Sequence, residues 1–165
     1  MPVMTSDKNG CVDEILDPIV VKQILRCFEN HGLVGALGGS GLLAARGLTQ
    51  VVHDWDLTTD GAPSSFEAAL VEVGYPYRCG SAGVGAFATT ALYIVEAGTH
   101  EVDVIVGFAV RTEGRRIELP TRVTGTWLGL PLGDPSVWEQ AYRAIGETAK
   151  SDLLASWQER TEPVL

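Results

Sequence analysis

The sequence predicts an α/β (α+β) fold, in which helices and strands follow one another along a chain of 165 residues. Three observations predict it. Hydrophobic residues make up 45% of the chain and charged residues 20%, as in ordinary folded proteins. A helix start signal, Asp followed by Pro, occurs at Asp17 and again at Asp134. Two β-rich runs, 88–96 and 99–108, are separated by Ala97-Gly98, which is typical of an antiparallel hairpin.

Length and charge limit the classes of protein to consider. The length favours one domain over residues 1–165, with residues 1–12 as a loose N-terminal arm. A formal net charge of −9 favours a small-molecule substrate and disfavours a long contact with RNA, because the chain repels polyanions. We expect a cytoplasmic protein without membrane contact, since the sequence shows neither a targeting segment nor a long apolar run.

Five helices are predicted from their boundary signals. Proline at the first helical position opens the first and the fourth, and Ser64-x-x-Glu67 forms a capping box before the third. A glycine follows each of the first four, at Gly32, Gly47, Gly74 and Gly146. In chain order the helices should cover 18–31, 40–46, 65–73, 135–145 and 148–159.

Strands are predicted between these helices. The apolar run 33–37 is consistent with a buried strand, and the β-rich run 51–59 predicts the next one. Residues 75–86 should hold a short strand and a glycine-rich loop, and 111–130 should supply further short strands. Together with the hairpin over 88–108, these runs predict a sheet of several strands.

A possible site begins where the first of these strands meets a helix. Gly38, Gly39 and Ser40 lie at that junction, where free backbone amides and a hydroxyl can bind a phosphate. Asp54 and Asp56, two residues apart on the predicted strand 51–59, should point to the same side and share a hard cation. Because Mg²⁺ takes carboxylates together with substrate phosphates, the two features favour one common site.

A third carboxylate comes from the hairpin. Val102, Val104 and Val106 share one face of the run 99–108, and Asp103 lies on the other. A charge at the centre of an apolar strand is costly unless it is paired or bound to metal. Asp103 is therefore the candidate that would complete a two-metal site for an in-line displacement.

In this order, the motifs resemble those of the nucleotidyltransferase superfamily, and in particular small lincosamide-type antibiotic nucleotidyltransferases and toxin-type nucleotidyltransferases. The matching stretches are Gly38-Gly39-Ser40, His53-Asp54-Trp55-Asp56-Leu57 and Val102-Asp103-Val104. Residues 146–154 also resemble a helical Lys-Asp signature of those families, with Ser151 where an acidic residue often follows the lysine.

The resemblance implies a mixed β-sheet flanked by helices, with further helices at the C-terminus. It implies that Asp54, Asp56 and Asp103 are catalytic and bind Mg²⁺ or Mn²⁺, with Asp103 as third ligand or as base for the acceptor hydroxyl. A set of four residues, Gly38, Gly39, Ser40 and Lys150, would bind the NTP.

The implied activity is transfer of a nucleoside monophosphate from an NTP to a hydroxyl of an acceptor. The favoured partners are the NTP and a small-molecule acceptor, whereas an RNA acceptor is disfavoured by the acidic charge without being excluded. No separate acceptor-binding domain is evident. That favours either a homodimer whose second subunit completes the cleft or an inactive nucleotide-binding or regulatory module.

A dinucleotide-binding (Rossmann-type) domain is the second alternative. Residues 39–44 fit the pattern GxGxxA, and Asp60 follows about twenty residues later, as in that fingerprint. It would bury Asp54 and Asp56 in a parallel strand covered on both faces, which is unfavourable for two unpaired charges.

Overall fold

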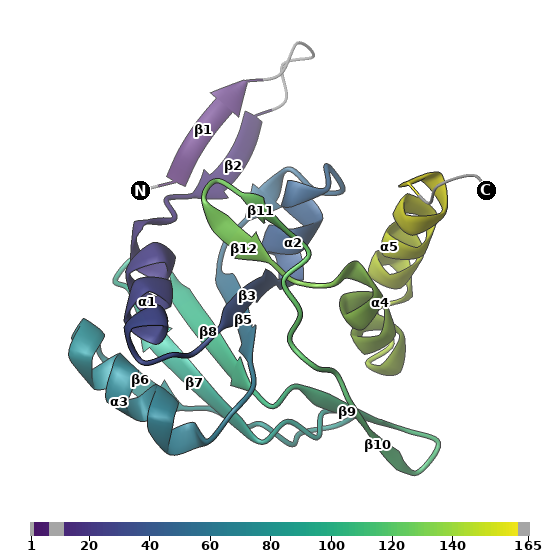
Figure 1. Ribbon diagram of the computed structural model, residues 1–165. Helices are drawn as coiled ribbons and strands as arrows, with labels where there is room; N and C mark the ends of the chain where they lie inside the picture. Colours follow the sequence, from purple (N-terminus) through teal and green to yellow (C-terminus); the bar gives the residue numbers. More distant parts are fainter. Residues whose placement is uncertain (1, 7–11, 162–165) are drawn as a thin grey trace.

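The computed structural model describes residues 2–6 and 12–161, and a seven-stranded sheet forms its centre (Figure 1). The strands of this sheet are β3 (Gly35–Gly38), β5 (Trp55–Thr59), β6 (Tyr77–Cys79), β7 (Ala91–Glu96), β8 (Glu101–Val106), β11 (Gly125–Trp127) and β12 (Leu130–Leu132). Their order is β11-β12-β3-β5-β8-β7-β6. β5 runs parallel to β8 and β12 parallel to β3, while the other neighbours are antiparallel. The predicted mixed sheet is confirmed.

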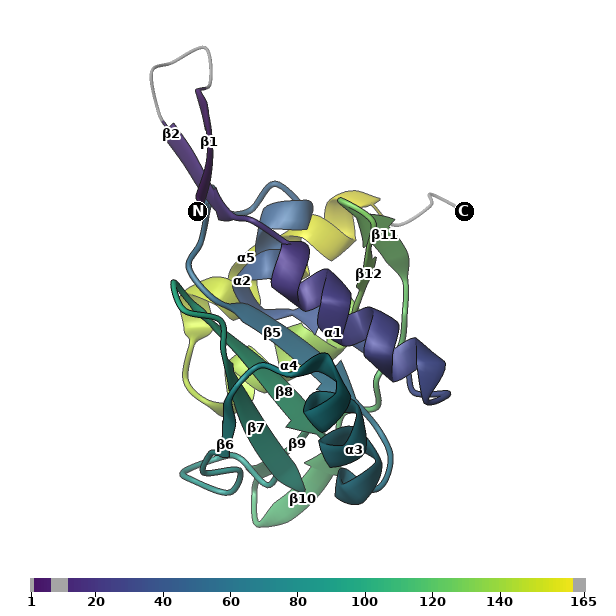
Figure 2. The same cartoon turned by 90° about the vertical axis from the view of Figure 1, so that its left-hand side faces the viewer.

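Helices cover both faces of this sheet, as predicted. They are α1 (Ile19–Asn30), α2 (Gly39–Ala45), α3 (Pro63–Val73), α4 (Pro135–Ala144) and α5 (Thr148–Thr161). Figure 2 shows α1 and α3 together on one face, where the rings of Phe28 and Phe66 meet edge to face at 5.3 Å, and α4 and α5 on the other. Among the described residues, no helix combines the length and apolar character needed to cross a bilayer.

Two smaller sheets lie outside the central one. β1 (Pro2–Ser6), β2 (Val12–Leu16) and β4 (Val51–Val52) form the first, and β9 (Ala109–Thr112) and β10 (Arg115–Glu118) form the second. Where the sequence predicts a loose arm over residues 1–12, β1 therefore pairs with β2. Residues 1 and 7–11 of that arm lie outside the described residues.

The prediction of a single strand over 51–59 is wrong. β4 pairs with β2, whereas β5 pairs with β3 and β8, so the chain passes from one sheet to another. His53 and Asp54 form the bend between them. Asp54 thus precedes the strand that carries Asp56, and its side chain is not fixed by the pleat of that strand.

The topology excludes the dinucleotide-binding alternative. β3 and β5, which α2 connects, are antiparallel neighbours, with Ala36 opposite Thr58. A dinucleotide-binding unit instead requires two parallel strands joined by a crossover helix. The GxGxxA pattern over residues 39–44 therefore reflects the local turn into α2.

The C-terminal helices are docked onto the end of β3. Asp134 caps α4 by accepting the Ser136 backbone N–H at 2.8 Å, and the Gly133 N–H donates to the Leu37 carbonyl at 2.9 Å. Trp138 then lies so close to Gly38 that a Cβ added to this glycine would overlap the indole ring. The absence of a side chain at Gly38 thus lets α4 approach the sheet.

We expect Gly38→Ala to lower the free energy of unfolding by about 1–3 kcal/mol, the usual cost of overpacking a core. Gly38 has an ordinary φ of −127°, so the cost comes from the contact with Trp138 and not from backbone strain. Urea denaturation would measure it. Gly83→Ala is the matched control, because its added methyl meets no atom closer than 4.0 Å. Equal stability of the two variants would contradict this account of the packing.

Candidate active site

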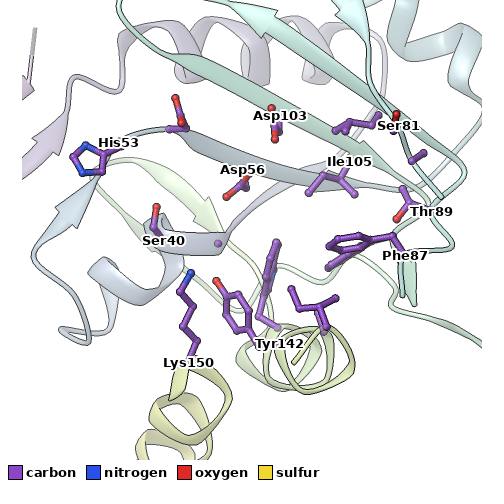
Figure 3. Close-up of a pocket in the computed structure, with 18 of the residues that line it drawn as sticks. Ser40, His53, Asp56, Ser81, Phe87, Thr89, Asp103, Ile105, Tyr142 and Lys150 are labelled. Carbon is purple, nitrogen blue, oxygen red and sulfur yellow. The ribbon is translucent and has the colours of Figure 1, made fainter. Parts of the chain in front are cut away.

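Two of the predicted acids lie directly side by side on the central sheet. Asp56 of β5 and Asp103 of β8 are register partners in the parallel pair, so they share a face. Figure 3 shows both side chains directed toward α4 and α5, away from α1 and α3. They line a cavity of about 460 Å³, together with Gly39, Ser40 and other residues.

The electrostatics of this pair are unfavourable without a cation. Burial, together with the charges of Asp103 and Asp54, raises the pKa of Asp56 to about 7, while the charge of Lys150 acts to lower it. Burial also raises the pKa of Asp103 to about 6, with Glu101 contributing. Within residues 2–6 and 12–161, no basic side chain forms an ion pair with Asp54, Asp56 or Asp103. Lys150 and Arg78 act to lower the pKa values of Asp56 and Asp103 respectively, but without an ion pair this compensation is incomplete.

Asp54 lines the same cavity but is held differently. Its Oδ1 accepts the backbone N–H of Glu101, at the start of β8, at 2.9 Å. This bond ties the bend before β5 to the strand that carries Asp103. In the part of the chain that the structure describes, no three His, Cys, Asp or Glu side chains are grouped so as to hold a metal ion.

The glycine pair has two separate structural roles. Gly39 begins α2 with φ +56°, a conformation that favours glycine, and a Cβ there would overlap Oδ2 of Asp56. The backbone at the start of α2 thus approaches the acidic pair closely. Gly38 faces Trp138 and is not among the cavity-lining residues, while Ser40 is.

Lys150 reaches the cavity from the first turn of α5. Its Nζ lies 5.4 Å from the centre of the Tyr142 ring, at the distance of a cation–π contact. In Figure 3 Lys150 extends from below toward Ser40, with Asp56 beyond them on the sheet. A cationic group and the α2 N-terminus therefore face the same space next to the carboxylates.

The sequence did not reveal the aromatic wall of the cavity. Ring centres follow one another at 6.4, 5.0 and 5.6 Å along a row formed by Phe87, Phe108, Trp138 and Tyr142. All four line the cavity. They come from three separate segments without a common spacing, so no sequence pattern groups them. Of the apolar lining residues, only Ile105 could have been placed on this face, because it follows Asp103 by two residues on the same strand.

Comparisons with known proteins give relatives in structure alone. No protein-family model matches the chain, and no curated protein matches its sequence. The provisionally assigned nucleotidyltransferase TM1012 of Thermotoga maritima is similar over 86% of this chain and 92% of its own, with 22% identity and a TM-score of 0.57.

The antibiotic-resistance factor ANT(2'')-Ia is also similar. Its solution structure matches 86% of this chain and 91% of its own, with 17% identity and a TM-score of 0.50. A second structure of it, in complex with adenylyl-2''-tobramycin, covers 87% of this chain and 98% of its own, with 17% identity and a TM-score of 0.48. The fold of this chain is that of the nucleotidyltransferases.

Proposed function

We propose that this chain is a metal-dependent nucleotidyltransferase, which transfers a nucleoside monophosphate from an NTP to a hydroxyl group and releases pyrophosphate. The observation that carries the proposal is the juxtaposition of Asp56 and Asp103 in one cavity with the α2 N-terminus and Lys150. Paired carboxylates next to donors for a phosphate are what a metal-bound triphosphate requires.

Mg²⁺ or Mn²⁺ fits the donor set. Asp56 and Asp103 offer hard oxygen ligands without a basic partner among the described residues, and Asp54 adds a carboxylate at the same cavity. Mg²⁺ binds through one or two carboxylates plus substrate phosphates, so a cage of three protein ligands is not required. When bound, the metal would neutralise the charge of the triphosphate and of the transition state.

Residues of the chain bind the phosphates and accept the proton. The start of α2, with Gly39 and Ser40, and the ammonium of Lys150 bind the phosphates that leave. Asp103 accepts the proton of the acceptor hydroxyl. The acceptor oxygen forms a bond to the α-phosphorus while the bond from that phosphorus to the β-bridging oxygen breaks, and pyrophosphate leaves with the electron pair.

A small molecule remains the proposed acceptor. ANT(2'')-Ia, which shares the fold, is described as an antibiotic-resistance factor. A small-molecule acceptor is also compatible with the net charge of −9 of this chain. An inactive nucleotide-binding module remains the rival. Radiolabel transfer from α-labelled NTPs to a panel of hydroxyl compounds would separate the two, since an inert module binds NTP without producing a labelled acceptor.

We expect Asp56→Asn to abolish Mg²⁺-dependent ATP binding, because it removes one of the two facing carboxylates while keeping the size of the side chain. Isothermal titration calorimetry with and without Mg²⁺ would measure it. Asp152→Asn is the matched control, since Asp152 is exposed on α5 and does not line the cavity. Full Mg²⁺-dependent binding by the Asp56 variant would refute the metal role.

In EDTA at pH 8, Asp56→Asn should be more stable than the wild type. The folded-state pKa of Asp56 is about 7, well above the ordinary value of 3.8 for this side chain, so the native state binds the proton more tightly than the unfolded state. Stability is therefore lost as pH rises from about 4 to 7, by about 1.4 kcal/mol per pKa unit as an upper bound. Removing the charge should therefore raise Tm at pH 8, and the Tm difference between variant and wild type should become smaller toward pH 5. A Tm difference that does not vary with pH would contradict this.

Lys150→Met should weaken ATP binding about tenfold or more, with Lys150→Arg restoring part of the affinity, because the loss is one of positive charge beside the phosphates. Calorimetric titration of Mg²⁺·ATP would measure both variants. Lys22→Met, an exposed change on α1, is the control. Unchanged affinity in Lys150→Met would remove this residue from the proposed site.

A further inference from the structure

We propose that the half of the cavity beyond Asp103 is the acceptor site, and that it takes a small neutral alcohol or phenol whose skeleton next to the hydroxyl is apolar. This inference rests on the proposed nucleotidyl transfer. It names the acceptor class, which neither the sequence nor the fold indicates.

The cavity has two chemically different halves. Figure 3 shows Ser40, His53 and Lys150 on one side of Asp56, and Ser81, Phe87, Thr89 and Ile105 on the other. Ile105 follows Asp103 by two residues on β8, and its register partner on β7 is Leu92. These apolar side chains therefore continue the same face of the sheet directly after the acids, with Phe108 also lining the cavity.

The direction of the reaction assigns the apolar half to the acceptor. In phosphoryl-type transfer the attacking oxygen and the leaving oxygen lie roughly in line on opposite sides of the phosphorus. If pyrophosphate leaves toward Ser40 and Lys150, the attacking hydroxyl must approach from the opposite side. That side is formed by Ile105, Phe87 and Thr89. The nucleoside, which is an equatorial substituent of the α-phosphorus, points sideways from this line.

The lining selects against charged acceptors. Beyond Asp103, the cavity-lining residues are apolar or carry hydroxyls, and none of them is Asp, Glu, Lys or Arg. A polycation would lose its hydration there, and beyond Asp103 the lining offers no further carboxylate to compensate it. The cavity of about 460 Å³ also has to hold part of the nucleotide, so the space beside the attacking hydroxyl suits a compact ring system.

This wall is already formed in the structure. The segment that carries Phe87 is bound to β9, since the Ala88 N–H donates to the Ala109 carbonyl at 2.9 Å and the Arg111 N–H donates to the Ala86 carbonyl at 2.6 Å. Phe87 also stacks on Phe108, with an interplanar angle of 29°. A preformed apolar surface favours rigid aromatic or alicyclic ligands, because little ordering is needed on binding.

The test uses 2-naphthol, a compact neutral phenol, in calorimetric titrations with and without saturating ATP and Mg²⁺. We expect it to bind in both conditions, and Ile105→Thr to weaken its binding about tenfold or more, as for lost hydrophobic contacts in a pocket. ATP affinity should stay within about twofold. Ile117→Thr is the matched control, because Ile117 is exposed on β10 outside the cavity. Phe87→Ala gives a second variant should Ile105→Thr fold poorly.

With α-labelled ATP, wild type should label 2-naphthol and leave kanamycin and tRNA unlabelled. Preferential labelling of kanamycin or tRNA would overturn the proposal. The proposal would also be overturned if 2-naphthol displaced ATP and Ile105→Thr bound ATP more weakly, because the apolar half would then hold the nucleobase. ATP binding without 2-naphthol binding overturns this inference alone, whereas 2-naphthol binding without Mg²⁺-dependent ATP binding refutes the proposed function and the acceptor role with it.

Discussion

The approach of Asp56 to Asp103 on adjacent parallel strands is the constraint on which the rest of this structure depends. Two carboxylates at paired register positions, half-buried and without a basic partner among the described residues, are costly in a fold that has to be stable. Such a cost is typical of functional sites, where a ligand compensates it. Gly39 adds to the constraint, because its missing side chain leaves room for the Asp56 carboxylate at the start of α2.

The C-terminal helices turn this acidic face into a cavity with two ends. Trp138 packs α4 against Gly38, and Tyr142 on the same helix contacts the ammonium of Lys150. The same row of aromatic rings continues through Phe108 to Phe87 and forms the opposite end. One packing arrangement thus supplies both the cationic end, which suits phosphates, and the apolar end, which suits a neutral acceptor.

Local signals and the strand period predicted five helices, a sheet of several strands and the acids as candidates, whereas the mixed character of the sheet was implied by the resemblance to nucleotidyltransferases. The capping box at Ser64 was wrong, because α3 begins at Pro63 with Ala62 as its N-cap and without a side-chain cap. The sequence prediction also misplaced Asp54, because the switch of the chain from β4 to β5 depends on pairing with β2, which no local pattern encodes. It missed the aromatic wall for a related reason. Phe87, Phe108 and Trp138 converge only through the tertiary fold, and each alone is typical of core packing.

The most direct test of the central claim is a crystal structure with Mn²⁺ and a non-hydrolysable ATP analogue, with anomalous scattering used to locate the metal. We expect an anomalous peak shared by the carboxylates of Asp56 and Asp103, with the triphosphate directed toward Ser40 and Lys150. A nucleotide bound elsewhere, or a triphosphate in this cavity without metal at the acidic pair, would contradict it.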